Sequence, residues 1–164
     1  VIENSIKYLV KAGDIYLAGV GSSGLVCEDF LYKLQRAGQK AYYQRDAHTN
    51  LALITNIKKD DILVCISYSG TTKEVIIAAD YAKNIGAKVL TITKGANTGL
   101  SKLSDQVLLI PEIEKEMRFG AVSSRLSSQI TTDILYYGYL ADNMNDVTEN
   151  LKISKQLTNN LKDK

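Results

Sequence analysis

Two short loops rich in glycine and hydroxyl side chains hold the residues of this sequence that are best suited to bind a ligand. The first reads Gly19-Val20-Gly21-Ser22-Ser23-Gly24, and the second reads Ser67-Tyr68-Ser69-Gly70-Thr71-Thr72. Each loop follows a β-type run and opens a helical pattern, and the first N–H groups of a helix favour an anion. Glycine lets the backbone approach a ligand closely or take a positive φ. Amide and hydroxyl donors in this number suit a phosphate dianion without Arg or Lys.

Helix capping is the ordinary alternative for these hydroxyl groups, because Ser and Thr are good N-caps. One cap per helix would explain Ser23 and Thr72, but not six hydroxyls at two loops. We therefore predict that both loops bind one phosphate, and that Tyr68 packs over the rest of the ligand. The predicted site in the two loops consists of Gly21, Ser22, Ser23, Ser67, Tyr68, Ser69, Gly70, Thr71 and Thr72.

The first loop also fits the dinucleotide-binding pattern G-x-G-x-x-G after a strand. Asp46 lies near the distance at which an acid that binds ribose is expected. This alternative leaves the second loop unused, and two hydroxyls between the glycines suit a compact phosphate better than a pyrophosphate. The sequence therefore favours a phosphate ligand, and we expect no cofactor.

Strand and helix patterns alternate along the chain, which predicts a parallel sheet covered on both faces. The predicted strands are 14–20, 40–43, 61–67, 88–93 and 106–110, and the predicted helices are 2–12, 23–37, 47–57, 72–85, 123–142 and 145–162. The segment between the last two strands is expected to be a loop. With right-handed crossovers we predict a flavodoxin-like three-layer α/β/α sandwich of strand order 2-1-3-4-5. In that order the two loops meet at the switch point, where ligands bind.

Composition limits the class of protein. The 164 residues are 45% apolar and 23% charged, with a net charge of +2, which fits one globular domain over 1–164 and argues against nucleic acid or membrane as the main partner. No apolar run approaches the ~20 residues of a membrane span, and no signal peptide is visible, so we expect a cytoplasmic protein. Cys27 and Cys65 have no ligand-spaced partner and indicate core residues in a reducing compartment. No metal site is expected.

The two loops together resemble the signature of the SIS (sugar isomerase) domain, a G-x-G-x-S-G turn followed by an S-x-S-G-x-T loop. The resemblance covers nearly the whole chain. The stretch from Arg118 to Arg125 and the helix after it, with Gln129 and Asp133, are most similar to the effector domain of RpiR/MurR-type transcriptional regulators. This resemblance implies a phosphosugar sensor that reaches DNA only through a helix-turn-helix domain absent from this chain.

A phosphosugar isomerase is the alternative, because arabinose 5-phosphate isomerases are similar too. Their first turn has a functional Lys where this chain has Ser22, and their second loop has a functional Glu where it has Thr71. Aldose–ketose isomerisation moves a proton between neighbouring carbons and needs a base and an acid. Neither Ser22 nor Thr71 can serve at neutral pH, so we predict a sensor and no enzyme.

Four further residues are candidates for the site, each with an ordinary alternative. His48 matches an A-x-H of the isomerases and could bond a sugar hydroxyl or lie on a helix surface. Glu116 matches a Glu that they keep, or is a solvated charge. Ser123 and Ser124 open a helix and could reach the ligand or only cap.

Apolar residues near the C-terminus predict a homodimer or homotetramer. The helix over 145–162 presents Val147, Leu151 and Leu161 with few surfaces to cover them. A second stripe is either core or dimer seam, and it consists of Leu126, Ile130, Ile134 and Tyr137.

Overall fold

The computed structural model describes residues 1–112 and 121–159. Its centre is a five-stranded parallel sheet of order β2-β1-β3-β4-β5. The strands are β1 (Ile15–Ala18), β2 (Ala41–Tyr42), β3 (Ile62–Ile66), β4 (Lys88–Thr93) and β5 (Gln106–Leu109). The predicted order is confirmed. The central strand β3 is buried along its whole length, as its continuous apolar run indicates.

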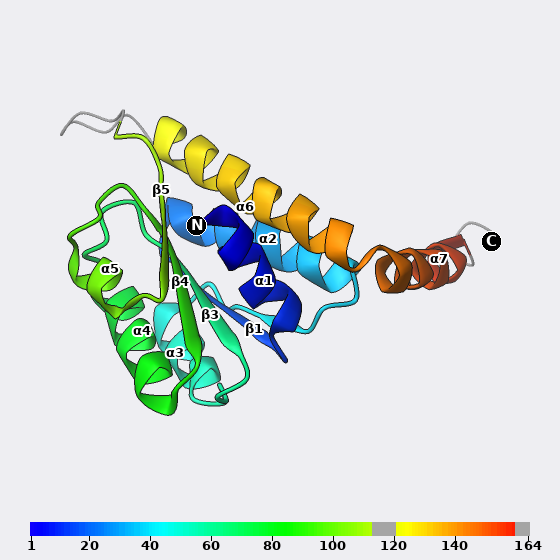
Figure 1. Ribbon diagram of the computed structural model, residues 1–164, viewed down its shortest axis with the longest axis horizontal. Coiled ribbons are helices and arrows are strands. Elements are labelled where there is room, and N and C mark those ends of the chain that lie inside the picture. The colour runs from blue at the N-terminus through cyan, green and yellow to red at the C-terminus, as the bar shows by residue number, and fades with distance from the viewer. Residues whose placement is uncertain (113–120, 160–164) are drawn as a thin grey trace.

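Helices cover both faces of the sheet (Figure 1). On one face lie α1 (Ile2–Lys11), α2 (Ser22–Arg36) and α6 (Val122–Asp142), and on the other lie α3 (Ala47–Ile54), α4 (Lys73–Ile85) and α5 (Gly99–Leu103). Side chains alternate along the strands: Val64 packs in the first core and Cys65 in the second. The predicted three-layer sandwich is confirmed.

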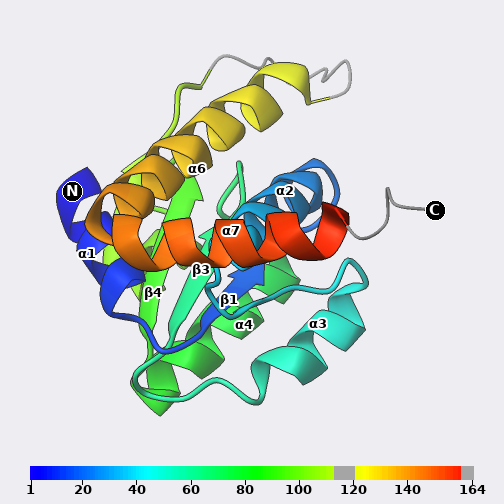
Figure 2. The ribbon, with the colours of Figure 1, turned by 90° about the vertical axis from the view of Figure 1, so that its right-hand side faces the viewer.

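The C-terminal helix α7 (Met144–Asn159) lies at the edge of the molecule, beyond the end of α6 (Figure 1), and runs across the face that is turned to the viewer in Figure 2. Val147 is its one buried residue in the described part of the chain, and Leu151 packs partly against the core. The prediction that Val147 lacks a covering surface is therefore wrong, and Leu161 lies outside the described residues. The exposed apolar residues of α7 are instead Met144, Ile153 and Leu157.

One predicted loop contains a helix, α5, which corrects the sequence analysis. Thr98 begins this helix, and its hydroxyl accepts a hydrogen bond of 3.1 Å from the backbone N–H of Ser101. Five residues are too few to show a helical period. The helix predicted over 47–57 ends earlier, at Ile54. Gly38, which follows the C-cap of α2, and Gly86, the C-cap of α4, take the positive φ that commonly ends a helix.

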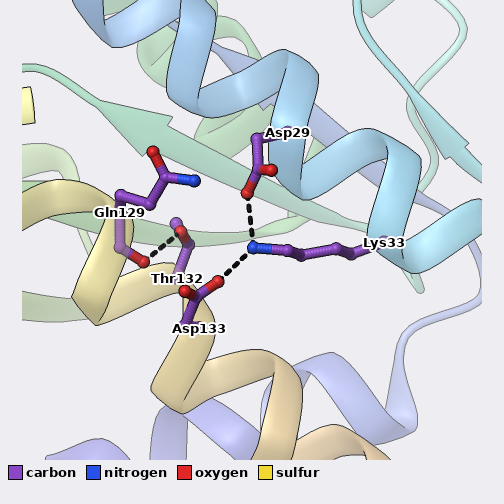
Figure 3. Close-up of polar contacts among 5 residues, drawn as sticks. All are labelled: Asp29, Lys33, Gln129, Thr132 and Asp133. Atoms are coloured by element: carbon purple, nitrogen blue, oxygen red, sulfur yellow. Dashed lines mark hydrogen bonds and ion pairs between the residues drawn. The ribbon is translucent and has the colours of Figure 1, made fainter. Parts of the chain in front are cut away.

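An ion cluster holds α6 along α2 (Figure 3). The Lys33 ammonium of α2 donates to Asp29 one turn earlier, at 2.6 Å, and to Asp133 of α6. Nearer the end of α6, the Tyr139 hydroxyl donates to the side-chain oxygen of Gln39 at 3.0 Å. These contacts fix the position of a helix whose first residues reach the candidate site.

Cys27 and Cys65 are fully buried and unbridged, which confirms them as core residues. Burial raises the pKa of the Cys65 thiol to about 12, and that of Cys27 well above its ordinary value.

In the described part of the chain, no helix is long and apolar enough to cross a membrane. Nor do the described residues gather three or more His, Cys, Asp or Glu side chains that could hold a metal ion.

Candidate functional site

The first glycine-rich loop is a tight turn between β1 and α2. Gly21 is the N-cap of α2, with φ 61° and ψ −125°, which L-residues rarely adopt. No side chain caps this helix end. Ser22 and Ser23 are the first two residues of the helix, and both are half-buried. Ser23 therefore does not cap α2, which was its alternative role. The first N–H groups of α2 and the two serines lie together at the carboxyl end of β1.

The second loop connects β3 to α4 and is held by its own hydroxyl groups. The Ser67 hydroxyl lies 3.1 Å from that of Thr72 and accepts a hydrogen bond from the Gly70 N–H at 3.2 Å. The Ser69 hydroxyl accepts from the Thr71 N–H and from the Thr71 hydroxyl, at 3.3 and 3.0 Å. Thr72 is the N-cap of α4 without a side-chain capping bond. The loop is thus rigidly shaped while several hydroxyl oxygens keep unused donor or acceptor capacity.

Gly70 is required at the tip of this loop for two reasons. Its φ is 66°, and a Cβ there would lie 2.4 Å from the Thr98 hydroxyl oxygen. The Leu100 N–H also donates to the Gly70 carbonyl at 3.3 Å. The start of α5 therefore packs directly on the second loop.

The two loops and the start of α6 enclose a cavity of about 130 Å³. Six of its wall residues carry aliphatic hydroxyls, and none of the described ones carries a carboxylate, an imidazole or a cation. The wall consists of Val20, Ser22, Ser23, Ile66, Ser67, Tyr68, Ser69, Thr72, Ala121 and Ser124. A larger groove of about 710 Å³ lies between α2 and α7, but neither a glycine loop nor a helix N-terminus contributes to its described wall.

Comparison with protein families decides the identity of this architecture. The family model of the SIS domain matches residues 8–137, which include both loops, the whole sheet and most of α6. The chain belongs to the SIS domain family.

Solved structures agree with this assignment. The Vibrio vulnificus NanR protein, complexed with ManNAc-6P, is 26% identical with a TM-score of 0.87, covering 98% of this chain and 60% of that one. The sugar isomerase domain of the RpiR transcription factor from Sphaerobacter thermophilus is 15% identical with a TM-score of 0.82, covering 94% and 85%. A Methanococcus jannaschii protein, inferred from its structure to be a 3-hexulose-6-phosphate isomerase, is 23% identical with a TM-score of 0.72, covering 91% and 82%. The last two show the fold alone, and this chain spans 60% of the length of NanR.

Within this SIS domain, the cavity brings together most of the residues that the sequence singles out. Seven predicted site residues line its wall, namely Ser22, Ser23, Ser67, Tyr68, Ser69, Thr72 and Ser124. Gly21 and Gly70 are not on the wall but shape the two loops. Ser124 is buried, and its hydroxyl donates to the Ala121 carbonyl at 3.3 Å.

Four other predicted residues are not brought to the wall by the described structure. Thr71 is exposed and bonds to Ser69. Ser123 is half-buried beside the wall residue Ser124 without being part of the wall. His48 is exposed in the first turn of α3 and lines no part of the cavity in the single chain. Glu116 lies outside the described residues.

Three apolar wall residues were not foreseen. Ile66 is the last residue of β3, while Val20 lies in the first loop, two residues after β1, and is 40% exposed. Both fall at the ends of the predicted strands, which could have indicated them. Ala121 is the N-cap of α6 and has a φ of 53°. The sequence does not predict this conformation of Ala121, because an alanine rarely takes positive φ.

Asp46, which the dinucleotide alternative would use for ribose, has a different role in this SIS domain. It is the N-cap of α3, and its carboxylate accepts from the Thr49 N–H at 2.8 Å and from the Thr49 hydroxyl at 2.7 Å. The hydrogen bond from the Thr49 backbone, followed by that from its side chain, lowers the pKa of Asp46. The carboxylate is thus engaged as a helix cap, which removes support from the dinucleotide alternative.

Proposed function

We propose that this SIS domain is the phosphosugar-binding sensor of a transcriptional regulator of carbohydrate metabolism. The observation that carries the proposal is the shared cavity, in which two loops that open helices face one hollow lined by hydroxyl groups. Each helix N-terminus contributes a partial positive charge of about half a unit and free N–H donors. Together they can neutralise a phosphate dianion without a cation on the described wall.

The size of the cavity supports a phosphoryl group as its occupant. A volume of about 130 Å³ equals that of roughly four water molecules at ~30 Å³ each. Pockets that enclose a whole drug-sized ligand measure about 300–1,000 Å³. We therefore propose that the phosphate enters the cavity, with Tyr68 against the sugar, and that the sugar extends outward. Groups beyond the wall, His48, Ser123 and Glu116 among them, then contact the sugar in the assembled protein.

The residue types at the site favour binding over isomerisation. Ser22 and Thr71 stand where the similar isomerases have Lys and Glu, and neither transfers protons readily at neutral pH. The described wall contains no carboxylate, imidazole or amine that could act as a general base. The similarity to the NanR protein, which is complexed with ManNAc-6P, over 98% of this chain also supports binding of a phosphosugar. DNA would then be contacted through a helix-turn-helix domain that does not belong to these residues.

We propose a cytoplasmic homodimer or homotetramer, and exposed apolar residues support the association of subunits. The stripe on α6 is not core, because its four side chains are 45–71% exposed in the single chain, and the remaining alternative is a dimer seam. The stripe consists of Leu126, Ile130, Ile134 and Tyr137. Because α6 begins at the cavity, ligand binding can shift the population of subunit arrangements, and attached DNA-binding domains would respond.

A melting-temperature screen tests this proposal. Ligand at about a hundred times its dissociation constant should add ~2.7 kcal/mol, or roughly 5–10 °C for a chain of this size. The panel is ManNAc-6P, with hexose, hexosamine, pentose and N-acetylmuramate phosphates, and each free sugar is its control. We expect a response to one phosphosugar and no aldose–ketose conversion. Conversion would favour the isomerase, and a response to a dinucleotide alone would overturn the proposal.

A further inference from the structure

A lysine packs against one residue of the cavity wall. Lys94 follows Thr93, the last residue of β4, at the sheet edge where both loops lie. Its ammonium nitrogen is 5.4 Å from the centre of the Tyr68 ring. Tyr68 is a wall residue and only 5% exposed. The ammonium therefore lies against a residue of the wall, while Lys94 itself does not line the cavity.

The backbone fixes Lys94 and Tyr68 relative to one another. The Lys94 N–H donates to the Tyr68 carbonyl at 3.1 Å, and the buried Thr93 hydroxyl donates to the same oxygen at 3.2 Å. These two bonds join the end of β4 to the second loop. A cation on the face of an aromatic ring is itself a favourable arrangement, so the ammonium has a defined place against the ring.

A carboxylate partly neutralises this charge. Glu112, just after β5, forms an ion pair with the Lys94 ammonium. The Lys94 side chain is 29% exposed and that of Glu112 is 64% exposed, so water screens the acid more than the base. Both residues therefore contribute to the potential at Tyr68, and the ammonium is the less screened of the two charges.

We propose that Lys94 raises the affinity of the cavity for phosphorylated over neutral ligands without touching them, and that Glu112 reduces this effect. The inference rests on the proposed function, because it assigns an electrostatic determinant to the same site. Protein between a fixed charge and an anion screens their attraction less than open water does. A neutral sugar lacks the charge that the ammonium attracts.

The same strand provides a matched control at its other end. Lys88, the first residue of β4, lies 5.6 Å from the centre of the Tyr8 ring and forms an ion pair of 2.8 Å with Asp105. This second group of lysine, tyrosine and carboxylate is at the amino edge of the sheet, away from the cavity. This second group has the same three residue types as the first, but it lies too far from the cavity to affect the binding of the ligand.

Calorimetric titration of the chain with inorganic phosphate and with ManNAc-6P tests the inference. We expect Lys94→Met to weaken binding about threefold to tenfold at low ionic strength, and Glu112→Gln to tighten it about twofold. Lys94→Arg should stay within about twofold of the parent chain, and Lys88→Met should not change affinity. The effect of Lys94→Met should shrink as salt is raised to about 0.5 M, where the Debye length is only a few ångströms.

Each other outcome decides against the inference. If the parent chain binds phosphate and Lys94→Met binds it equally well, the inference fails while the proposed function stands. An equal loss in Lys94→Arg, or a loss that salt does not reduce, means that Lys94 only supports the loop and also overturns it. Absence of any binding by the parent chain overturns both. Should Lys94→Met fail to fold, Glu112→Gln decides, because unchanged or weaker binding by it contradicts the inference.

Discussion

The Tyr43 hydroxyl donates a buried hydrogen bond of 2.8 Å to the carbonyl oxygen of Gly19. Gly19 is the residue at which β1 passes into the first loop, and Tyr43 directly follows β2, at the edge of the sheet. Gly24 in the first turn of α2 makes room for the bond, since a Cβ there would lie 2.5 Å from the Tyr43 oxygen. Burial raises the pKa of Tyr43, so its hydroxyl remains a donor throughout the neutral range. The edge strand thus holds the first loop in place.

Tyr43→Phe should therefore affect both stability and binding. Loss of the donor leaves a buried carbonyl without this partner, which should cost about 1–3 kcal/mol of unfolding free energy. Phosphate affinity should fall as well, because the Gly19 peptide is free to turn. Urea unfolding and calorimetry measure the two effects. Tyr32→Phe is the control, since the Tyr32 hydroxyl accepts an exposed bond from Arg36, and equal behaviour of the two variants would show that the Tyr43 bond has no such role.

Ser69→Ala tests the hydroxyls of the second loop. If this hydroxyl donates to a phosphate dianion, its removal should weaken binding by about 1–3 kcal/mol, with little change in the free energy of unfolding. Ser127→Ala is the matched control, because Ser127 is half-buried on α6 but does not line the cavity. An unchanged affinity of Ser69→Ala would mean that Ser69 serves only its bonds to Thr71.

The sheet order and the meeting of the two loops could be predicted because each depends on a local pattern and a general rule. The buried run Ile62–Ile66 identifies the central strand, and the parallel sheet then places the loops of β1 and β3 side by side. The glycines with positive φ were foreseeable for the same reason, since a tight turn before a helix needs them.

What could not be predicted depends on side chains that meet through the tertiary fold. The helix α5 is too short for periodicity, although Thr98 and Ser101 form a recognisable capping pair. Ser23 looks like an N-cap, yet the chain begins its helix one residue earlier, after Gly21. The contact of Lys94 with Tyr68 joins the ends of two strands, and no spacing in the sequence indicates it.

Lys33→Met tests the ion cluster between α2 and α6. Burial lowers the pKa of Lys33, but hydrogen bonds to Asp133 and Asp29 outweigh it, and the net pKa lies above the ordinary 10.5. The contribution to stability is therefore complete below pH 10.5 and is lost as pH rises through the folded-state value. We expect a loss of about 1–2 kcal/mol at pH 7.

Urea unfolding at pH 7, 9 and 11 measures this dependence. The difference between Lys33→Met and the parent chain should be the same at pH 7 and 9 and smaller at pH 11. Lys152→Met, at an exposed position of α7, should show little effect at any pH. A difference that stays constant up to pH 11 would mean that lost packing of the lysine stem, not the ion cluster, causes the destabilisation.

Ile130→Glu tests the proposed subunit interface. A carboxylate in the middle of the α6 stripe would be buried without a partner in a dimer, which is strongly unfavourable. Light scattering should then show a parent chain that is dimeric or tetrameric and a variant that is monomeric with an unchanged fold. Ile77→Glu is the control, because Ile77 is similarly exposed but lies on α4. A parent chain that is monomeric with and without phosphosugar would remove the basis for this interface.

The most direct measurement is a crystal structure of this chain with the phosphosugar that raises its melting temperature most. The account predicts the phosphorus atom inside the cavity, with phosphate oxygens within about 3 Å of hydroxyls from both loops and of N–H groups that begin α2. The hydroxyls concerned are those of Ser22, Ser69 and Thr72. A phosphate bound elsewhere, or a cavity closed by packed side chains with the ligand present, would contradict it.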